Sequence, residues 1–192
     1  MTRDNINGLI LAGGRSERMG TNKAFIDYYG KPQYQYVYDL LKESCENVYI
    51  SCKAAGEFPV EFNPLLDRFD LDSPINGIVS AFEKQPACVW LTAPVDMPLL
   101  DLQLIQNLID HRDKEKMATC FWDSSGNSPE PLLTIWEMRA HSPLLKFLKS
   151  GGVSPRKFLQ THACNIIGWP DAKYLININT PVELATFRKT YM

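Results

Sequence analysis

The amino-acid sequence predicts an α/β fold, a single-domain three-layer α/β/α sandwich around a mainly parallel, Rossmann-like sheet. Short apolar runs alternate with amphipathic stretches of helical period, which is the pattern of successive βαβ units. The run Cys88–Thr92 contains no polar alternation, as expected for a strand buried on both faces. No internal repeat or Pro/Gly/Ser-rich linker divides the chain, so we expect residues 1–192 to form one domain.

Local signals place the individual elements. The apolar run Leu9–Ala12 is stopped by Gly13 and Gly14, as at the end of a buried strand. Pro32 precedes apolar residues at helical spacing, and we expect it in the first turn of a helix, where its missing N–H costs nothing. Further strands are expected at 48–52, 88–92, 117–121 and 132–136, and further helices at 75–82, from 101, at 143–148, from 154 and from 180.

Two helix starts carry specific capping residues. Asp101 can cap a helix, and we expect that helix to turn four apolar side chains inward: Leu102, Ile105, Leu108 and Ile109. Thr180, Pro181 and Glu183 have the spacing of a capping box at the start of a last helix. Residues 123–131 are rich in Ser, Pro, Gly and Asn, so we expect a surface loop there.

Composition excludes several classes of protein. Hydrophobic residues make up 45% of the chain and charged residues 22%, which excludes a disordered chain, a collagen-like repeat and a coiled-coil rod. The formal net charge of −2 provides no general attraction for nucleic acid or anionic membrane. The five cysteines form no C-x-x-C pair, and no segment is long and apolar enough for a signal sequence or a membrane span. We therefore expect a cytoplasmic protein that binds neither nucleic acid nor membrane.

A glycine turn follows the first expected strand. Gly13 and Gly14 allow backbone N–H groups to approach an anion closely, and Arg15, Arg18 and Lys23 add positive charge. The spacing matches neither the P-loop nor the G-x-G-x-x-G pattern. The turn is therefore either a phosphate-binding loop or an ordinary connection between a strand and a helix.

Two aspartates are candidates for the same site. Asp96 follows the buried run Cys88–Thr92, so its carboxylate is expected at the same end of the sheet as the glycine turn. It either binds Mg²⁺, which prefers oxygen ligands, or caps a turn. Asp67 either accepts hydrogen bonds from a nucleobase or belongs, with Asp70 and Asp72, to a solvated acidic loop.

Two asparagines near the last helix form a second candidate site. Asn177 and Asn179 alternate with isoleucines, so we expect both amides on one face of a strand. They either recognise a ligand rich in donors and acceptors or serve the entry to the helix that starts at Thr180.

The string L-A-G-G-x-S-x-R-M-G-x-x-K, residues 11–23, resembles the opening of nucleotidyltransferases, and most of all the molybdenum cofactor guanylyltransferase family. Separated motifs at 66–69, 73–77, 93–98 and 175–181 extend this resemblance over nearly the whole chain. It implies catalytic roles for Lys23 and Asp96, with Asp96 binding Mg²⁺, and pterin contacts by Asn177 and Asn179. It implies nucleotide contacts by Leu11, Ala12, Gly13, Gly14, Arg15, Lys23, Ser51, Asp67 and Asp96.

The implied reaction is transfer of GMP from GTP to the phosphate of molybdopterin, with proteins that deliver or receive the cofactor as possible partners. The chain departs from the family pattern at Asn22, Ser51, Glu130 and residues 152–156. A relative that uses CTP, and a catalytically weak nucleotide-binding regulator, remain alternatives.

Overall fold

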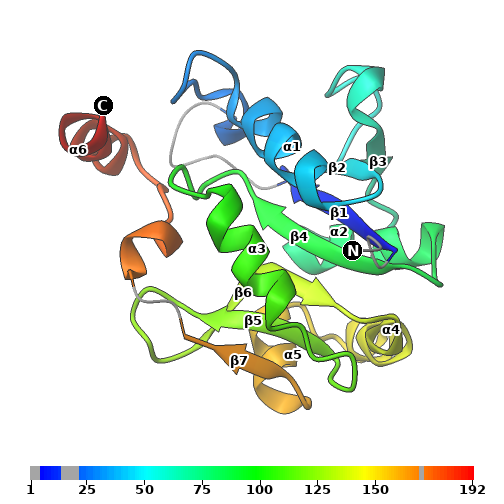
Figure 1. Ribbon diagram of the computed structural model, residues 1–192. Helices are drawn as coiled ribbons and strands as arrows, with labels where there is room; N and C mark the ends of the chain where they lie inside the picture. The colour runs from blue at the N-terminus through cyan, green and yellow to red at the C-terminus, as the bar shows by residue number, and fades with distance from the viewer. Residues whose placement is uncertain (1–4, 14–21, 169–170) are drawn as a thin grey trace.

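The fold is a mixed sheet with helices on both of its faces (Figure 1). The computed structural model describes residues 5–13, 22–168 and 171–192. Its strands are β1 (Ile6–Leu11), β2 (Val48–Cys52), β3 (Pro64–Leu66), β4 (Val89–Pro94), β5 (Ala118–Trp122), β6 (Pro129–Trp136) and β7 (Asn165–Ile167). Its α-helices are α1 (Gln33–Ser44), α2 (Pro74–Lys84), α3 (Leu102–Asp110), α4 (His141–Lys149), α5 (Pro155–Thr161) and α6 (Pro181–Tyr191). The predicted α/β/α fold class is confirmed.

The strand order is β3-β2-β1-β4-β6-β5-β7. Strands β3, β2, β1 and β4 are parallel neighbours, whereas β6 pairs antiparallel with both β4 and β5, and β5 is parallel to β7. Among the described strands, β6 therefore alone runs in the opposite direction. We call the edge of the sheet at which β1 to β4 end the carboxyl edge; β5 and β7 also end there, and β6 begins there.

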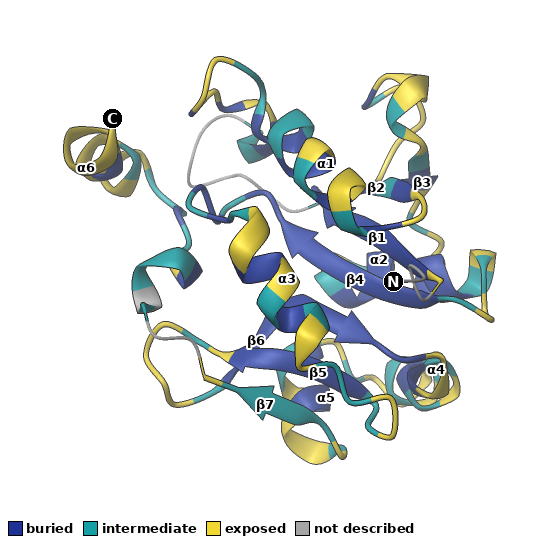
Figure 2. Cartoon of the chain, in the orientation of Figure 1, coloured by how far each residue is buried: buried dark blue, intermediate teal, exposed yellow. Residues whose placement is uncertain are grey.

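Two apolar layers hold the helices on the sheet. One layer packs α1 and α3 against one face, and the other packs α2, α4 and α5 against the opposite face. Every residue of β1 and β4 is buried (Figure 2). Burying both faces explains why these strands lack polar alternation in the sequence.

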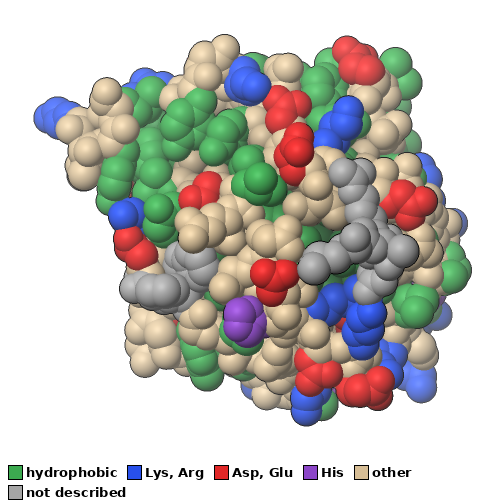
Figure 3. Space-filling model, in the orientation of Figure 1, with side chains coloured by type: hydrophobic (Ala, Val, Ile, Leu, Met, Phe, Trp, Pro, Cys, Tyr) green, Lys and Arg blue, Asp and Glu red, His purple; other side chains and the backbone are tan. Residues whose placement is uncertain are grey.

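Helix α6 lies outside the two layers, beyond the carboxyl edge (Figure 1). Phe187 packs edge-on against Tyr28 with ring centroids 5.4 Å apart, in a small cluster that also contains Ile26 and Ile178. On the face seen in Figure 3, hydrophobic side chains gather between α6 and α1, while charged side chains of both signs are spread over the rest. The cluster of Ile26, Tyr28, Ile178 and Phe187 therefore packs the last helix against the segment that follows Lys23.

The predicted helix starts are mostly correct. Asp101 and Ser154 cap α3 and α5, and Thr180 and Glu183 form the predicted capping box of α6. Pro32, expected within the first turn of α1, is instead the residue before it.

Two predictions about burial are wrong. Leu102 is exposed, and Leu104 takes its place in the core, because the cap at Asp101 leaves the first helical position facing solvent. The predicted loop 123–131 ends earlier, since β6 begins at Pro129 and buries Glu130.

No described helix is long and apolar enough to cross a membrane.

Candidate active site

The order in which the chain adds strands to the sheet reverses at β1. The chain passes from β1 to β2 on one side, whereas β4 pairs with the other side of β1. In open α/β sheets such a reversal leaves a crevice at the carboxyl ends of the strands, where ligands bind. Lys23 follows β1 and Asp96 follows β4, so both residues lie at the carboxyl edge beside this reversal, as the sequence predicts.

Lys23 is held by a short 3₁₀ turn and by two polar partners. Asn22 caps this turn, since its side-chain oxygen accepts a hydrogen bond of 3.0 Å from the Ala24 N–H. The Lys23 ammonium donates to the Asn179 side-chain oxygen at 2.6 Å and lies 3.3 Å from Asp96 Oδ2. Asn22 therefore serves as a cap even though it departs from the family pattern.

Asp96 presents a carboxylate whose two oxygens differ. Oδ2 faces Lys23, whereas Oδ1 is buried without a hydrogen-bond partner among the described residues. Burial raises the pKa of Asp96, and the nearby Lys23 ammonium opposes this change. A buried acceptor without a partner is costly, so this oxygen has the chemistry to bind a cation or an N–H or O–H donor.

The predicted strand at Asn177 and Asn179 is wrong. Among the described residues, 176–180 have no strand partner. The segment is held instead by the Ile178 N–H, which donates to the Asp96 carbonyl at 2.8 Å. Glu183 Oε2 accepts from the Asn179 and Thr180 N–H groups at 2.7 and 2.9 Å. The capping box thereby fixes Asn179 against Lys23.

The two asparagines differ in their contacts. The side-chain oxygen of Asn179 accepts from Lys23, whereas the side-chain oxygen of Asn177 is buried and lacks a partner within the described part of the chain. The entry to α6 is thus both a helix cap and a segment that bonds Lys23 and the Asp96 main chain.

A second polar group lies on the other side of β1. Ser51, in β2, donates to Asp67 Oδ1 at 2.7 Å. Burial raises the pKa of Asp67, and the Ser51 hydroxyl lowers it. A methyl group added at Gly13 would lie 3.5 Å from Asp67 Oδ2, and one at Gly77 would lie 2.3 Å from Ser51 Oγ. Asp67 is therefore partly buried and held by a hydrogen bond close to Gly13, whereas Asp70 and Asp72 are exposed.

A cavity of about 220 Å³ opens beside Asp67. The loop that forms it is tied to α2, because the Asn76 side chain donates to the carbonyls of Phe69 and Leu71 and accepts from the Phe69 N–H. Lys53 also borders the cavity and pairs with Asp72. The motif 73–77 thus shapes the wall of a polar cavity next to Asp67.

The structure does not describe every predicted site residue. Gly14, Arg15 and Arg18 lie outside the described residues. The side chains of Leu11 and Ala12 are buried in the core, so any ligand contact by these two residues would come from their main chain.

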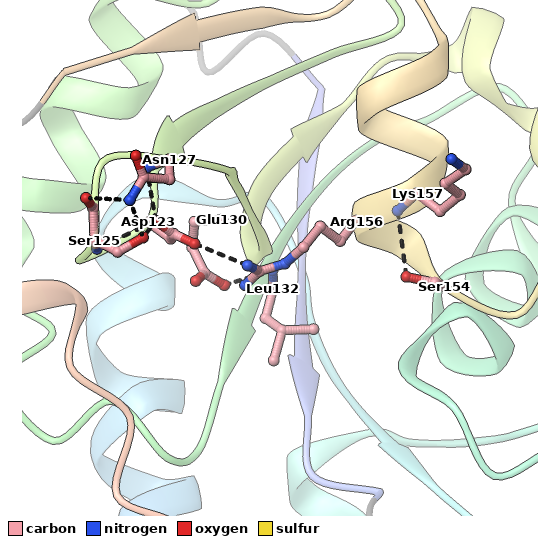
Figure 4. A network of polar contacts seen from close by, with 8 residues as sticks. All are labelled: Asp123, Ser125, Asn127, Glu130, Leu132, Ser154, Arg156 and Lys157. Atoms are coloured by element: carbon pink, nitrogen blue, oxygen red, sulfur yellow. Dashed lines mark hydrogen bonds and ion pairs between the residues drawn. The ribbon is translucent and has the colours of Figure 1, made fainter.

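A third polar group at the carboxyl edge was not singled out as a site by the sequence. Glu130, at the start of β6, is 1% exposed and accepts from the Leu132 N–H at 2.9 Å. Burial raises the pKa of Glu130 to about 7, the Leu132 amide and Arg156 lower it, and Asp96 and Asp123 raise it further. Arg156 reaches from α5 towards this carboxyl and bonds Asp123 at 2.8 Å (Figure 4). The only sequence signal was the departure from the family pattern at Glu130.

Comparison with known proteins first gives the class. The crystal structure of molybdopterin-guanine dinucleotide biosynthesis protein A from Archaeoglobus fulgidus superposes with a TM-score of 0.78 at 19% identity, covering 95% of this chain and 97% of that chain. This likeness shows that the two proteins share a fold.

The family follows from the sequence matches. The model of the MobA-like NTP transferase domain matches residues 8–165, and the chain belongs to this family. A molybdenum cofactor guanylyltransferase from Cupriavidus metallidurans is 30% identical, over 96% of this chain and 95% of that protein. A molybdenum cofactor biosynthesis bifunctional protein from Synechocystis is 34% identical over 92% of this chain, which spans about half of that relative's length (52%).

Proposed function

We propose that this protein transfers GMP from GTP to the phosphate of molybdopterin, forming molybdopterin guanine dinucleotide and pyrophosphate. The observation that carries the proposal is the Lys23–Asp96 pair, 3.3 Å apart at the strand-order reversal. The guanylyltransferase relative supports the choice of nucleotide and acceptor.

In the proposed reaction an oxygen of the acceptor phosphate attacks the α-phosphorus of GTP. A new P–O bond forms to the acceptor, the P–O bond to the β-phosphate breaks, and pyrophosphate leaves with that electron pair. An acceptor phosphate dianion needs no proton removed, so alignment and charge neutralisation supply most of the catalysis. No side-chain nucleophile is needed.

Lys23 has the central role in this proposal. Its ammonium would offset the charge that builds up on the triphosphate and the leaving pyrophosphate. Asn179 orients this ammonium through a neutral oxygen 2.6 Å away, which holds the group without cancelling its charge. The main chain of Leu11–Gly13 would supply N–H groups to the phosphates from the end of β1.

Asp96 fits a magnesium ligand. One or two carboxylates together with substrate phosphates commonly suffice for Mg²⁺, and Asp96 Oδ1 is buried without a partner among the described residues. Mg²⁺ held by Asp96 would supply positive charge that offsets the negative charge of the phosphates. Asp67, with Ser51 bonded to it, would accept from the nucleobase at the cavity on the other side of β1.

The direct test measures pyrophosphate release from GTP, Mg²⁺ and molybdopterin. Lys23→Ala and Asp96→Asn should each lower the rate on the order of 100-fold or more, since both remove charge stabilisation from the reacting phosphates. The exposed ion pair Lys31–Asp39, with a separation of 2.8 Å, provides matched controls. Lys31→Ala and Asp39→Asn should leave the rate unchanged.

Each alternative function gives a distinct result. Thermal shift with single nucleotides and Mg²⁺ should favour GTP, because a ligand bound only by the folded state raises its stability. A larger shift with CTP would indicate a cytidylyltransferase. A shift with GTP but no pyrophosphate release would indicate a nucleotide-binding regulator, and wild-type rates in both site variants would refute the proposed mechanism.

A further inference from the structure

A second cavity, of about 290 Å³, opens farther along the carboxyl edge. Trp122 at the end of β5, the hairpin loop 123–126, Gly168 after β7 and Leu175 form its walls. It lies on the opposite side of Asp96 from the Asp67 cavity, because β6, β5 and β7 follow β4 in the sheet. Its volume is at the lower end of the range for ligand pockets, which suits a ring system rather than a whole nucleotide.

Trp122 is unusual among the described tryptophans. Trp90 and Trp136 are fully buried, whereas Trp122 is 40% exposed. The pairing of β5 with β6 shifts register between Cys120 and Trp122, and such irregularities commonly redirect a side chain next to a functional site. Within the described residues, no hydrogen bond or ring contact engages the indole, so a face of this large aromatic group is available to a ligand.

Hydrogen bonds hold the hairpin loop that forms another wall of the cavity. Asp123 fixes the hairpin loop, accepting from the Ser125 N–H at 3.2 Å, the Ser125 hydroxyl at 2.7 Å and the Asn127 N–H at 3.3 Å. Arg156 holds the same carboxylate from α5 (Figure 4). Among the atoms of the described residues outside its chain neighbours, a methyl group added at Gly168 would meet none within 4 Å, so there is open space beside this residue.

The cavity is connected to the Lys23–Asp96 pair by two paths. Leu175 borders it, and Asn179, four residues further along, bonds Lys23; four residues of extended chain span at most about 14 Å. Through the sheet, β5 is two strands from β4, or about 10 Å. A phosphate at Asp96 therefore lies within reach of a ring held in the cavity.

We propose that this cavity, the acceptor pocket, binds the planar fused heterocycle of the phosphorylated acceptor, with the Trp122 indole packed on the face of the ring. The proposal rests on the proposed function, since the acceptor phosphate must then lie at the Lys23–Asp96 pair. Trp122 contacts the ring and not the reacting atoms, so it determines acceptor affinity and specificity. The nucleobase occupies the separate cavity at Asp67, which leaves the acceptor pocket to the second substrate.

The test measures binding directly, without turnover. Isothermal titration calorimetry compares a pterin phosphate monoester, glycerol 3-phosphate and GTP on the full chain with Mg²⁺. We expect the pterin phosphate to bind the wild type more tightly than glycerol 3-phosphate. Trp122→Ala should weaken pterin phosphate binding on the order of tenfold, the usual effect of losing an aromatic stacking partner. Trp122→Phe should restore part of the affinity.

The control is Met138→Ala. Met138 is 50% exposed and follows the end of β6, at the side of the sheet opposite the carboxyl edge. This variant should therefore bind all three ligands as the wild type does. Equal affinities of wild type and Trp122→Ala for the pterin phosphate would refute the acceptor pocket. Weakened GTP binding in Trp122→Ala would do the same, because it would place the nucleobase there.

Failure of the proposed function gives a different pattern. If the wild type binds the pterin phosphate through Trp122 but releases no pyrophosphate with GTP and molybdopterin, the pocket stands and the transfer reaction is wrong. If pyrophosphate is released while Trp122→Ala keeps the wild-type KM for molybdopterin, the reaction stands and the acceptor pocket is wrong.

Discussion

Replacing Glu130 by glutamine should make the protein more stable at alkaline pH. Glu130 is 1% exposed, and burial raises its pKa from 4.5 to about 7. Between these two pH values the folded protein keeps a proton that the unfolded chain releases, so the free energy of unfolding falls as the pH rises. Each pH unit of this interval is worth about 1.36 kcal/mol, which amounts to about 3 kcal/mol by pH 8.

Glutamine keeps the volume of the side chain and the oxygen that accepts from the Leu132 N–H, but it does not titrate. The stability advantage of Glu130→Gln over the wild type should therefore grow by about 2.5 kcal/mol between pH 5 and pH 8. Urea unfolding in metal-free buffer at both pH values measures this difference. Glu115→Gln is the control, since the Glu115 side chain is 83% exposed.

A difference between Glu130→Gln and the wild type that is the same at pH 5 and pH 8 would refute the reasoning. It would mean that the Glu130 carboxyl titrates in the folded protein much as it does in the unfolded chain. The burial of Glu130 beside Asp96 and Asp123 would then have no measurable electrostatic cost.

Two further substitutions test the packing of the site and the core. Gly77→Ala places a methyl group 2.3 Å from Ser51 Oγ and 2.9 Å from Ser51 Cβ, so urea unfolding should show that the free energy of unfolding falls by about 1–3 kcal/mol. In a double-mutant cycle, Ser51→Gly should recover part of this loss. Simple additivity of the two substitutions would contradict the clash. Glu137→Gln should cost about 3 kcal/mol by the same measurement, because it removes the negative charge that the nearly buried Arg112 contacts through two hydrogen bonds of 2.6 and 2.9 Å. A loss below about 0.5 kcal/mol, as in Glu115→Gln, would show that the pair acts like a surface pair.

The elements that the sequence predicted correctly are those encoded locally. The caps at Asp101, Ser154 and Thr180 act within three residues of the helix they start, so their sequence pattern is sufficient. Buried parallel strands likewise identify themselves by an unbroken apolar run, as β4 does. The reversed direction of β6 has no such local signal, since strand direction depends on which strands become neighbours.

The errors at the candidate site have the same origin. The alternation of Asn177 and Asn179 with isoleucines is typical of any extended segment. In the described part of the chain this segment pairs with no strand and is held by the bond from Ile178 to Asp96, a contact that the local sequence does not encode. Likewise, the sequence could not separate Asp67 from Asp70 and Asp72. The Ser51 hydroxyl, which is distant in sequence, makes that distinction.

The bond between Lys23 and Asn179 joins residues 156 positions apart, and this separation affects the order of events during protein synthesis. The ribosome translates β1 to β4, Lys23 and Asp96 long before it translates Asn179. A nascent chain can therefore build the β1 to β4 part of the sheet while Lys23 has yet to meet the Asn179 amide that bonds it in the complete structure. We expect catalytic competence to arise late, when the segment leading into α6 has emerged from the exit tunnel.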